Sequence, residues 1–323
     1  PCPEVVRRLR AGVGACRQDR QVTSIFRAGR QWLVRLRSGK VTLFSNGGGK
    51  PARSADRRVH VRRRAILVVA SLDDQGVIAL RRGHLLAQVF RARLHVVHVV
   101  PSSKPPLVVD EEAVREEVVR WAAEAAEVDL AGRFVRIDIG DPTAAVEKAA
   151  ALFGAELIVI GAPPTGTPTP EAEAMAGVVA ALASSLPRAS ALLVAHPPRT
   201  SCELVAATDL RDAQFPVVKI AAQLADALAA RVTVVHNLEN DGSVVALALE
   251  NIAGRLQELE RLAVELDRIR GGRVSTTRTT AEAIADVART RDADIAVVGI
   301  RRGHGRTLLS LLERTTCSVL AIP

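Results

Sequence analysis

The sequence D-A-D-I-A-V-V-G-I-R-R-G-H-G-R-T occupies residues 292–307, and the rest of the chain is best interpreted from it. Its apolar run, residues 295–298, is short, continuous and β-branched, which is typical of a strand buried on both faces of a parallel sheet. The run stops at Gly299, and a Gly-rich basic turn leads into a helix expected at 308–314. A strand that delivers such a turn to a helix start brings backbone N–H groups together with the positive helix end, so phosphate could bind there.

The same arrangement occurs earlier in the chain. Residues 155–161 read A-E-L-I-V-I-G and are followed by a loop of Pro, Thr and Gly. The sequence therefore carries this strand-and-loop unit twice.

Composition limits the classes of function. The 323 residues suit about two domains, and aromatic residues make up only 2% of them, which argues against stacking platforms for nucleic acid bases. The net charge of +9 is unevenly distributed, because residues 1–63 hold sixteen Lys/Arg against three Asp/Glu. The basic character therefore belongs to this N-terminal segment and not to the rest of the chain.

The cysteines and histidines give no metal-binding pattern. His95 and His98 are three residues apart on an expected strand, so their side chains should point to opposite faces. The cysteines lack a C-x-x-C spacing, which favours free thiols in a reducing compartment; they are Cys2, Cys16, Cys202 and Cys317.

Membrane and export signals are also not expected. No apolar run reaches the ~18 residues of a membrane span. No apolar region follows the basic N-terminal residues, so a secretory signal is not predicted. We expect a cytoplasmic protein with no membrane partner.

Residues 1–63 allow three interpretations: a small folded meander, a solvated extension and an electrostatic arm. Strands expected at 21–26, 31–37 and 41–45 would form a small meander, followed by a polar linker. The alternative is a solvated, poorly ordered extension. The excess of arginine would suit an electrostatic arm for nucleic acid.

The remaining sequence alternates strand and helix patterns. In residues 64–197, here called repeat 1, strands are expected at 65–70, 93–100, 134–139, 157–160 and 191–195, and helices at 76–90, 111–128, 143–153 and 178–186. In residues 202–323, here called repeat 2, strands are expected at 203–207, 232–236, 274–279, 295–298 and 318–322, and helices at 215–230, 244–269, 280–290 and 308–314. Ile66 and Leu204, which occupy equivalent positions, are 138 residues apart. Two copies of βαβαβαβαβ predict two doubly wound α/β domains.

Several stretches resemble a tandem universal stress protein. In repeat 2 they are L-V-A-A-T-D-L-R-D (204–212), A-A-R-V-T-V-V-H (229–236), A-D-I-A-V-V-G (293–299) and T-C-S-V-L-A-I (316–322). In repeat 1 they are G-D-P (140–142), G-A-E-L-I-V-I-G (154–161) and the strand at 191–195. The resemblance covers about residues 64–323 and leaves the N-terminal segment unexplained.

The resemblance implies the fold of each repeat. It is a five-stranded parallel sheet in the order 3-2-1-4-5, as in the adenine nucleotide alpha hydrolases, with strands one and four adjacent at the topological switch point. It also implies that the two repeats pair through their last strands, 191–195 and 318–322. Partners beyond this pairing, including a homo-oligomer and an adenine nucleotide, remain open.

The nucleotide-binding branch of this family implies a site in repeat 2. There, an Asp ends strand one and a Gly-rich loop after strand four wraps the phosphates. The loop is shortened in this sequence, but it keeps N–H donors and arginines, so it could hold ATP; otherwise it is a tight solvated turn. The candidate cofactor-binding residues are Asp209, Gly299, Arg302, Gly303, Gly305 and Thr307.

Repeat 1 departs further from that pattern. Ser71 or Leu72 stands where the Asp is expected, and two prolines, which lack N–H donors, occupy the loop after Gly161. Gly166 and Gly177 are near the interval expected for the loop, but no hydroxyl residue follows Gly177. ATP binding is less expected here than in repeat 2.

No residue pattern predicts an enzyme. The sequence offers no nucleophile elbow, Cys/His dyad or acid pair at a meaningful spacing. Asp209 and Asp212 could hold Mg²⁺ if a triphosphate bound, or could serve a turn and a helix start.

The resemblance implies a regulatory or protective stress protein. The alternatives are an adenine-nucleotide switch that uses repeat 2 and a nucleic acid-associated protein that uses residues 1–63.

Overall fold

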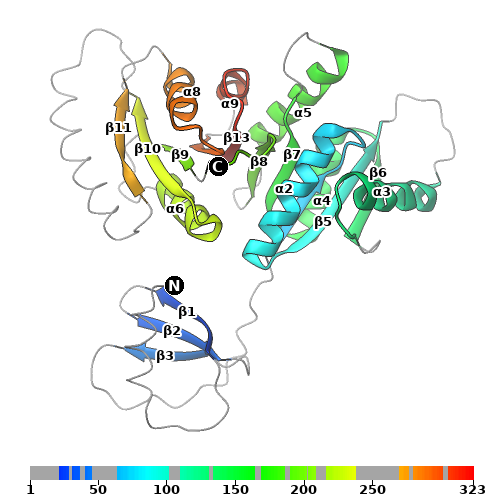
Figure 1. The fold of residues 1–323 in the computed structure, drawn as a ribbon. Coiled ribbons are helices and arrows are strands. Elements are labelled where there is room, and N and C mark those ends of the chain that lie inside the picture. Colours follow the sequence, from blue (N-terminus) through cyan, green and yellow to red (C-terminus); the bar gives the residue numbers. More distant parts are fainter. Residues whose placement is uncertain are drawn as a thin grey trace. The chain divides into compact units, whose positions relative to one another are not determined.

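The computed structural model describes residues 22–28, 31–36, 41–45, 64–101, 110–130, 134–163, 169–185, 190–201, 203–208, 216–237, 269–275, 279–300 and 305–323. The chain divides into two compact units, Pro1–Val61 and Arg62–Pro323 (Figure 1). In the first unit, β1 (Val22–Ala28), β2 (Gln31–Leu36) and β3 (Val41–Ser45) form an antiparallel sheet in the order β1-β2-β3. This is a meander.

The second unit is built on one ten-stranded sheet in the order β11-β10-β9-β12-β13-β8-β7-β4-β5-β6. The strands of repeat 1 are β4 (Ala65–Val69), β5 (Arg93–Val100), β6 (Val135–Ile139), β7 (Ala155–Gly161) and β8 (Ala191–Ala195). Those of repeat 2 are β9 (Glu203–Ala207), β10 (Arg231–Asn237), β11 (Ile269–Ser275), β12 (Ile295–Gly299) and β13 (Ser318–Ile322). Numbered within each repeat, both halves have the order 3-2-1-4-5, which confirms the predicted fold class.

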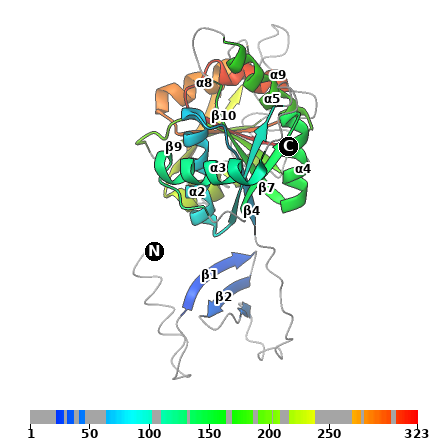
Figure 2. The same cartoon turned by 90° about the vertical axis from the view of Figure 1, so that its right-hand side faces the viewer.

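Helices cover both faces of this sheet. In repeat 1 they are α2 (Asp74–Phe90), α3 (Glu111–Ala125), α4 (Pro142–Phe153) and α5 (Pro170–Ser185); in repeat 2 they are α6 (Pro216–Leu228), α8 (Thr280–Arg291) and α9 (Gly305–Leu312). One core cluster packs α2, α3 and α6 on the sheet, and a second packs α4, α5, α8 and α9 on it. Figure 2 views the unit from the end of the sheet that carries β6, with α3 toward the viewer.

Local sequence explains where several helices start. Asp73, Asp110 and Asp141 each accept a hydrogen bond from a backbone N–H in the first turn of the following helix. Thr279 does the same for α8. Such caps satisfy donors that have no partner within the helix.

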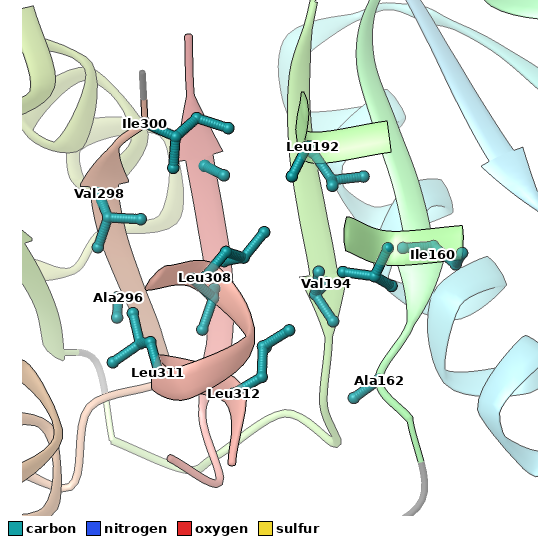
Figure 3. Packing of buried hydrophobic residues seen from close by; sticks show 14 of the residues in the cluster. Ile160, Ala162, Leu192, Val194, Ala296, Val298, Ile300, Leu308, Leu311 and Leu312 are labelled. Atoms are coloured by element: carbon teal, nitrogen blue, oxygen red, sulfur yellow. The ribbon is translucent and has the colours of Figure 1, made fainter. Parts of the chain in front are cut away.

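The two repeats meet at β8 and β13. These strands pair antiparallel, with Leu193 opposite Leu320, whereas the other strand pairs of this sheet are parallel. The pairing is the one expected from the resemblance. Figure 3 shows side chains of β7 and β8 from repeat 1 together with side chains of β12 and α9 from repeat 2, all members of one buried cluster. The two repeats therefore share a core as well as a sheet.

Three predicted boundaries were wrong. Strand three of repeat 2 begins at Ile269 and not at 274, so the helix expected at 244–269 does not include Ile269; most of that predicted helix lies outside the described residues. The register with β10 shifts between Ile269 and Gly271, and glycine is tolerated in a strand at such irregularities.

The helices α5 and α9 also begin earlier than predicted. Helix α5 starts at Pro170, because Thr169 Oγ1 accepts from Ala172 N at 3.2 Å and proline suits the first helical turn. Gly177 therefore lies within a helix and not in a phosphate loop. Helix α9 starts at Gly305, three residues before the predicted position.

Candidate functional site

The topological switch point of each repeat lies between its first and fourth strands. In repeat 1 these are β4 and β7, and in repeat 2 they are β9 and β12. Ile66 pairs with Leu157, and Leu204 pairs with Ile295, so equivalent positions are 138 residues apart in both strands. The carboxyl ends of these strands are where an open α/β sheet places a ligand.

In repeat 1, the aspartate nearest the switch point serves the start of a helix. Asp73 Oδ1 accepts from Gly76 N and from Ser71 Oγ, each at 2.7 Å. Asp73 is thus the N-cap of α2. Its carboxylate is engaged in hydrogen bonds within its own turn, and these bonds stabilise the start of α2.

The switch point of repeat 1 is filled by backbone. A Cβ built on Gly161, at the end of β7, would lie 2.6 Å from the Gln75 carbonyl oxygen. A Cβ on Gly76 would lie 1.7 Å from the Ser71 carbonyl oxygen. Gly161 is buried. The start of α2 therefore packs directly on the end of β7, at the place where a ligand would need to lie.

The equivalent position in repeat 2 is more open. Gly299 corresponds to Gly161, and it is exposed. Among the described residues, a Cβ built on Gly299 would meet a single atom within 4 Å, Val217 Cγ2 at 3.2 Å. The chain leaves β12 through Ile300, whose N–H donates to the Ile322 carbonyl at 2.8 Å.

The structure describes part of the predicted site in repeat 2. Gly299 ends β12, and Gly305 and Thr307 lie in the first turn of α9. Three candidates, namely Asp209, Arg302 and Gly303, lie outside the described residues, as does Asp212. Strand β12 and helix α9 thus frame the predicted loop.

A pair of histidines was not among the predicted site residues. His98 Nδ1 lies 2.8 Å from the Ala70 carbonyl oxygen, and His236 Nδ1 lies 2.8 Å from the Thr208 carbonyl oxygen. A carbonyl can only accept, so Nδ1 carries the proton in both rings. In each repeat the histidine fixes the residue that follows strand one, and in repeat 2 that residue directly precedes Asp209. The sequence could have indicated this pair, because the two histidines are 138 residues apart, as other equivalent positions of the two repeats are.

His95 has a different environment from His98. Its ring stacks on Phe153, with centroids 4.1 Å apart, and meets Phe134 edge-on at 5.6 Å. Burial, together with the charge of Arg93, lowers the pKa of His95. His95 is a neutral core residue near neutral pH.

A cavity of about 470 Å³ lies at the outer edge of repeat 1. Two basic side chains of its lining contact the same carboxylate: Arg136 Nη2 donates to Asp138 Oδ1 at 2.8 Å, and Lys148 Nζ lies 3.6 Å from Asp138 Oδ1. The hydrogen bond from Arg136 lowers the pKa of Asp138. Asp138 is therefore an ion-paired carboxylate and poorly suited to act as a general acid.

Other reactive groups are few in the part of the chain that the structure describes. Cys317 is a buried free thiol, and burial raises its pKa, which disfavours the nucleophilic thiolate. The described residues contain no group of three or more His, Cys, Asp or Glu side chains that could hold a metal ion. Of the helices described, none is long and apolar enough to cross a membrane.

Comparison with known proteins agrees with this architecture. The model of the universal stress protein family matches residues 62–170 and 203–323. A functionally unknown protein from Pseudomonas aeruginosa PAO1 is similar in structure, with a TM-score of 0.57 and 17% identity over 81% of this chain and 92% of that chain. A universal stress protein from Archaeoglobus fulgidus DSM 4304 has a TM-score of 0.54 and 15% identity over 80% of this chain and 96% of that chain. No curated protein matches the sequence.

Proposed function

Because the chain belongs to the universal stress protein family, with one family match in each repeat, we propose that it has a regulatory or protective role in the stress response. It acts by binding and not by catalytic turnover, and it works in the cytoplasm. Repeat 1 is a structural partner, and repeat 2 carries the binding position. The observation that carries this division of roles is the contrast between buried Gly161 and exposed Gly299 at equivalent positions.

The geometry of repeat 1 supports its structural role. The Gln75 carbonyl lies so close to Gly161 that even a methyl group would not fit. Asp73 is engaged as the cap of α2. A nucleotide would have to displace the first turn of this helix in order to reach the switch point.

A second candidate function is an adenine-nucleotide switch in repeat 2. Exposed Gly299 at the end of β12 and the start of α9 at Gly305 support it, since a helix start near a strand end favours phosphate. The loop sequence I-R-R-G-H-G-R-T, residues 300–307, adds three arginines. ATP is the nucleotide to test first.

Nucleic acid binding through residues 1–63 is a further candidate, supported by the sixteen Lys/Arg in this segment. Backbone phosphates attract such a segment without sequence readout. Affinity for DNA or RNA would fall steeply with salt, and deletion of residues 1–63 would abolish it.

The decisive experiment is mass spectrometry of small molecules released from protein purified without added nucleotide, followed by ATP titration. A switch in repeat 2 predicts one equivalent of ATP bound, lost in Gly303→Val and kept in Gly166→Val, which changes a glycine of the corresponding loop in repeat 1. Absence of any binding would leave a protein that acts through protein contacts alone. Two equivalents of similar affinity would contradict the structural role assigned to repeat 1.

A further inference from the structure

One buried ion pair crosses between the two repeats. Arg82, on α2 of repeat 1, donates from Nη1 to Asp294 Oδ2 and from Nη2 to Asp294 Oδ1, each at 2.7 Å. The two side chains are only 4% and 12% exposed. A two-point guanidinium–carboxylate contact has a fixed geometry and is strong when water is excluded.

Asp294 is held rigidly for this contact. Its backbone N–H donates to the Glu203 carbonyl at 2.8 Å, and its carbonyl accepts from Ser318 N at 3.0 Å. These bonds join it to the first residues of β9 and β13. Oδ1 also accepts from Arg199 N at 2.9 Å, so the segment between the repeats contributes to the same site.

The seam between β8 and β13 lies beside the ion pair. Ser318, the first residue of β13, accepts from His196 N at 3.1 Å, and its Oγ lies 3.4 Å from Arg82 Nη2. His196 directly follows β8. The contacts of Arg82 therefore depend on where β13 lies relative to β8.

The ion pair has no counterpart on the other side of the pseudo-twofold axis. With the 138-residue spacing, the position equivalent to Arg82 is Ile220 on α6, and the position equivalent to Asp294 is Glu156. Ile220 is a partly buried apolar residue. Glu156 is exposed, and it pairs at 3.6 Å with Arg64 of its own repeat.

Because the ion pair exists on one side of the axis alone, it can distinguish which repeat pairs with repeat 2 at the sheet edge. We propose that Arg82 and Asp294 make repeat 2 specific for repeat 1 as its edge-to-edge partner. If the β13 edges of two chains paired in the same geometry, each Asp294 would face Ile220 of the other chain and would be buried without a cation. A buried carboxylate that has lost its partner is strongly unfavourable. The charge therefore disfavours association of two chains through repeat 2.

Two variants of the full chain test the proposal, because one removes the arginine of the ion pair and the other removes the aspartate. Arg82→Met keeps Asp294 and therefore keeps the barrier to pairing of repeat 2 with itself. Asp294→Leu removes that barrier, because an apolar side chain would then face Ile220, and it leaves Arg82 buried without its partner in the pairing within the chain. Sedimentation should show a concentration-dependent dimer for Asp294→Leu and none for Arg82→Met. Identical oligomeric states for the two variants would overturn the proposal.

A double variant tests the proposal even if a single variant, which buries an unpaired charge, fails to fold. Arg82→Met combined with Asp294→Leu leaves no unpaired charge at this position, so the β8–β13 pairing within the chain is again favoured, and the double variant should fold and sediment as the wild-type chain does. If the double variant dimerises as Asp294→Leu does, an unpaired charge is not what selects the partner.

Arg81→Met is the matched control for the contribution of the ion pair itself. Arg81 is the neighbouring residue on α2. Its side chain is exposed, pairs with Glu127 and donates to the Ala125 and Ala126 carbonyls, all within repeat 1. In urea unfolding, Arg82→Met should lower the equilibrium constant for folding on the order of 100-fold or more, whereas Arg81→Met should lower it by about 10-fold at most. Equal effects would mean that the crossing pair has no special role.

Discussion

At the scale of single residues, two buried histidines, one at the seam and one in the core of repeat 1, should make the folded chain sensitive to acid. His196 lies directly after β8 and is 8% exposed, and its Nε2 has no hydrogen-bond partner among the described residues. Burial, followed by the charge of Arg199, lowers its pKa. The pKa of His95 is lowered in the same direction, by burial and by Arg93.

These histidines should make the folded chain less stable in mild acid. As the pH falls below about 6.5, the unfolded histidines take up protons before the folded ones do, so the unfolded state is favoured. The stability that they contribute is complete above about pH 6.5 and is lost as the pH falls through the lower, folded pKa. A pKa difference of one corresponds to about 1.4 kcal/mol.

Urea unfolding at pH 7.5 and pH 5.5 measures this loss. In His196→Gln the drop in unfolding free energy between the two pH values should be smaller than in the wild-type chain. His84→Gln, which changes a histidine that pairs with Gln88 on the surface of α2, is the control. An unchanged drop in His196→Gln would exclude this histidine as a source of the acid sensitivity.

At the scale of elements, helix α2 packs unusually close to the sheet. A Cβ built on Gly83 would lie 2.3 Å from Val68 Cγ2 on β4. This contact places α2, and with it Arg82, against the sheet beside the seam. The absence of a side chain at residue 83 is therefore what allows the neighbouring arginine to reach repeat 2.

Gly83→Ala should destabilise the fold by about 1–3 kcal/mol, because a methyl group overpacks this contact. Gly177→Ala, at an exposed position of α5 where no described atom lies within 4 Å of the new Cβ, should instead stabilise it by up to about 1 kcal/mol. Thermal or urea unfolding of the two variants gives the comparison. Stabilisation by both substitutions would show that α2 can move away from β4 at no cost.

The elements themselves were largely predictable from sequence, because several buried strands are uninterrupted apolar runs, such as residues 295–298. The errors fell where local signals conflict. Pro170 opens α5 instead of preventing it, and the glycines after Ile269 lie in an irregular strand instead of ending a helix. The strand order followed from the family resemblance, since periodicity alone does not give it.

The contacts that distinguish the two repeats were not predictable. Arg82 and Asp294 are 212 residues apart, and each by itself resembles an ordinary surface charge. Only the antiparallel β8–β13 pairing brings them together. Likewise, the sequence indicates that Gly161 and Gly299 are equivalent, but not that one of them is covered by Gln75.

At the scale of the whole molecule, the two family domains of repeats 1 and 2 form a single folding unit. Ten strands share one sheet, and buried clusters on both of its faces include residues of both repeats. A substitution that destabilises one repeat should therefore also lower the stability of the other. Two independent domains joined by a linker would not behave in this way.

The most direct measurement is urea unfolding followed through Trp121, which lies on α3 of repeat 1, with the other tryptophan, in the first unit, changed by Trp32→Phe. In this background, Leu204→Ala removes a buried side chain of β9 in repeat 2 and should cost about 2–5 kcal/mol. Because the two repeats share one sheet, Trp121 fluorescence and far-ultraviolet circular dichroism should then report the same lowered midpoint. A Trp121 transition that stays in place while repeat 2 unfolds at lower urea would contradict it.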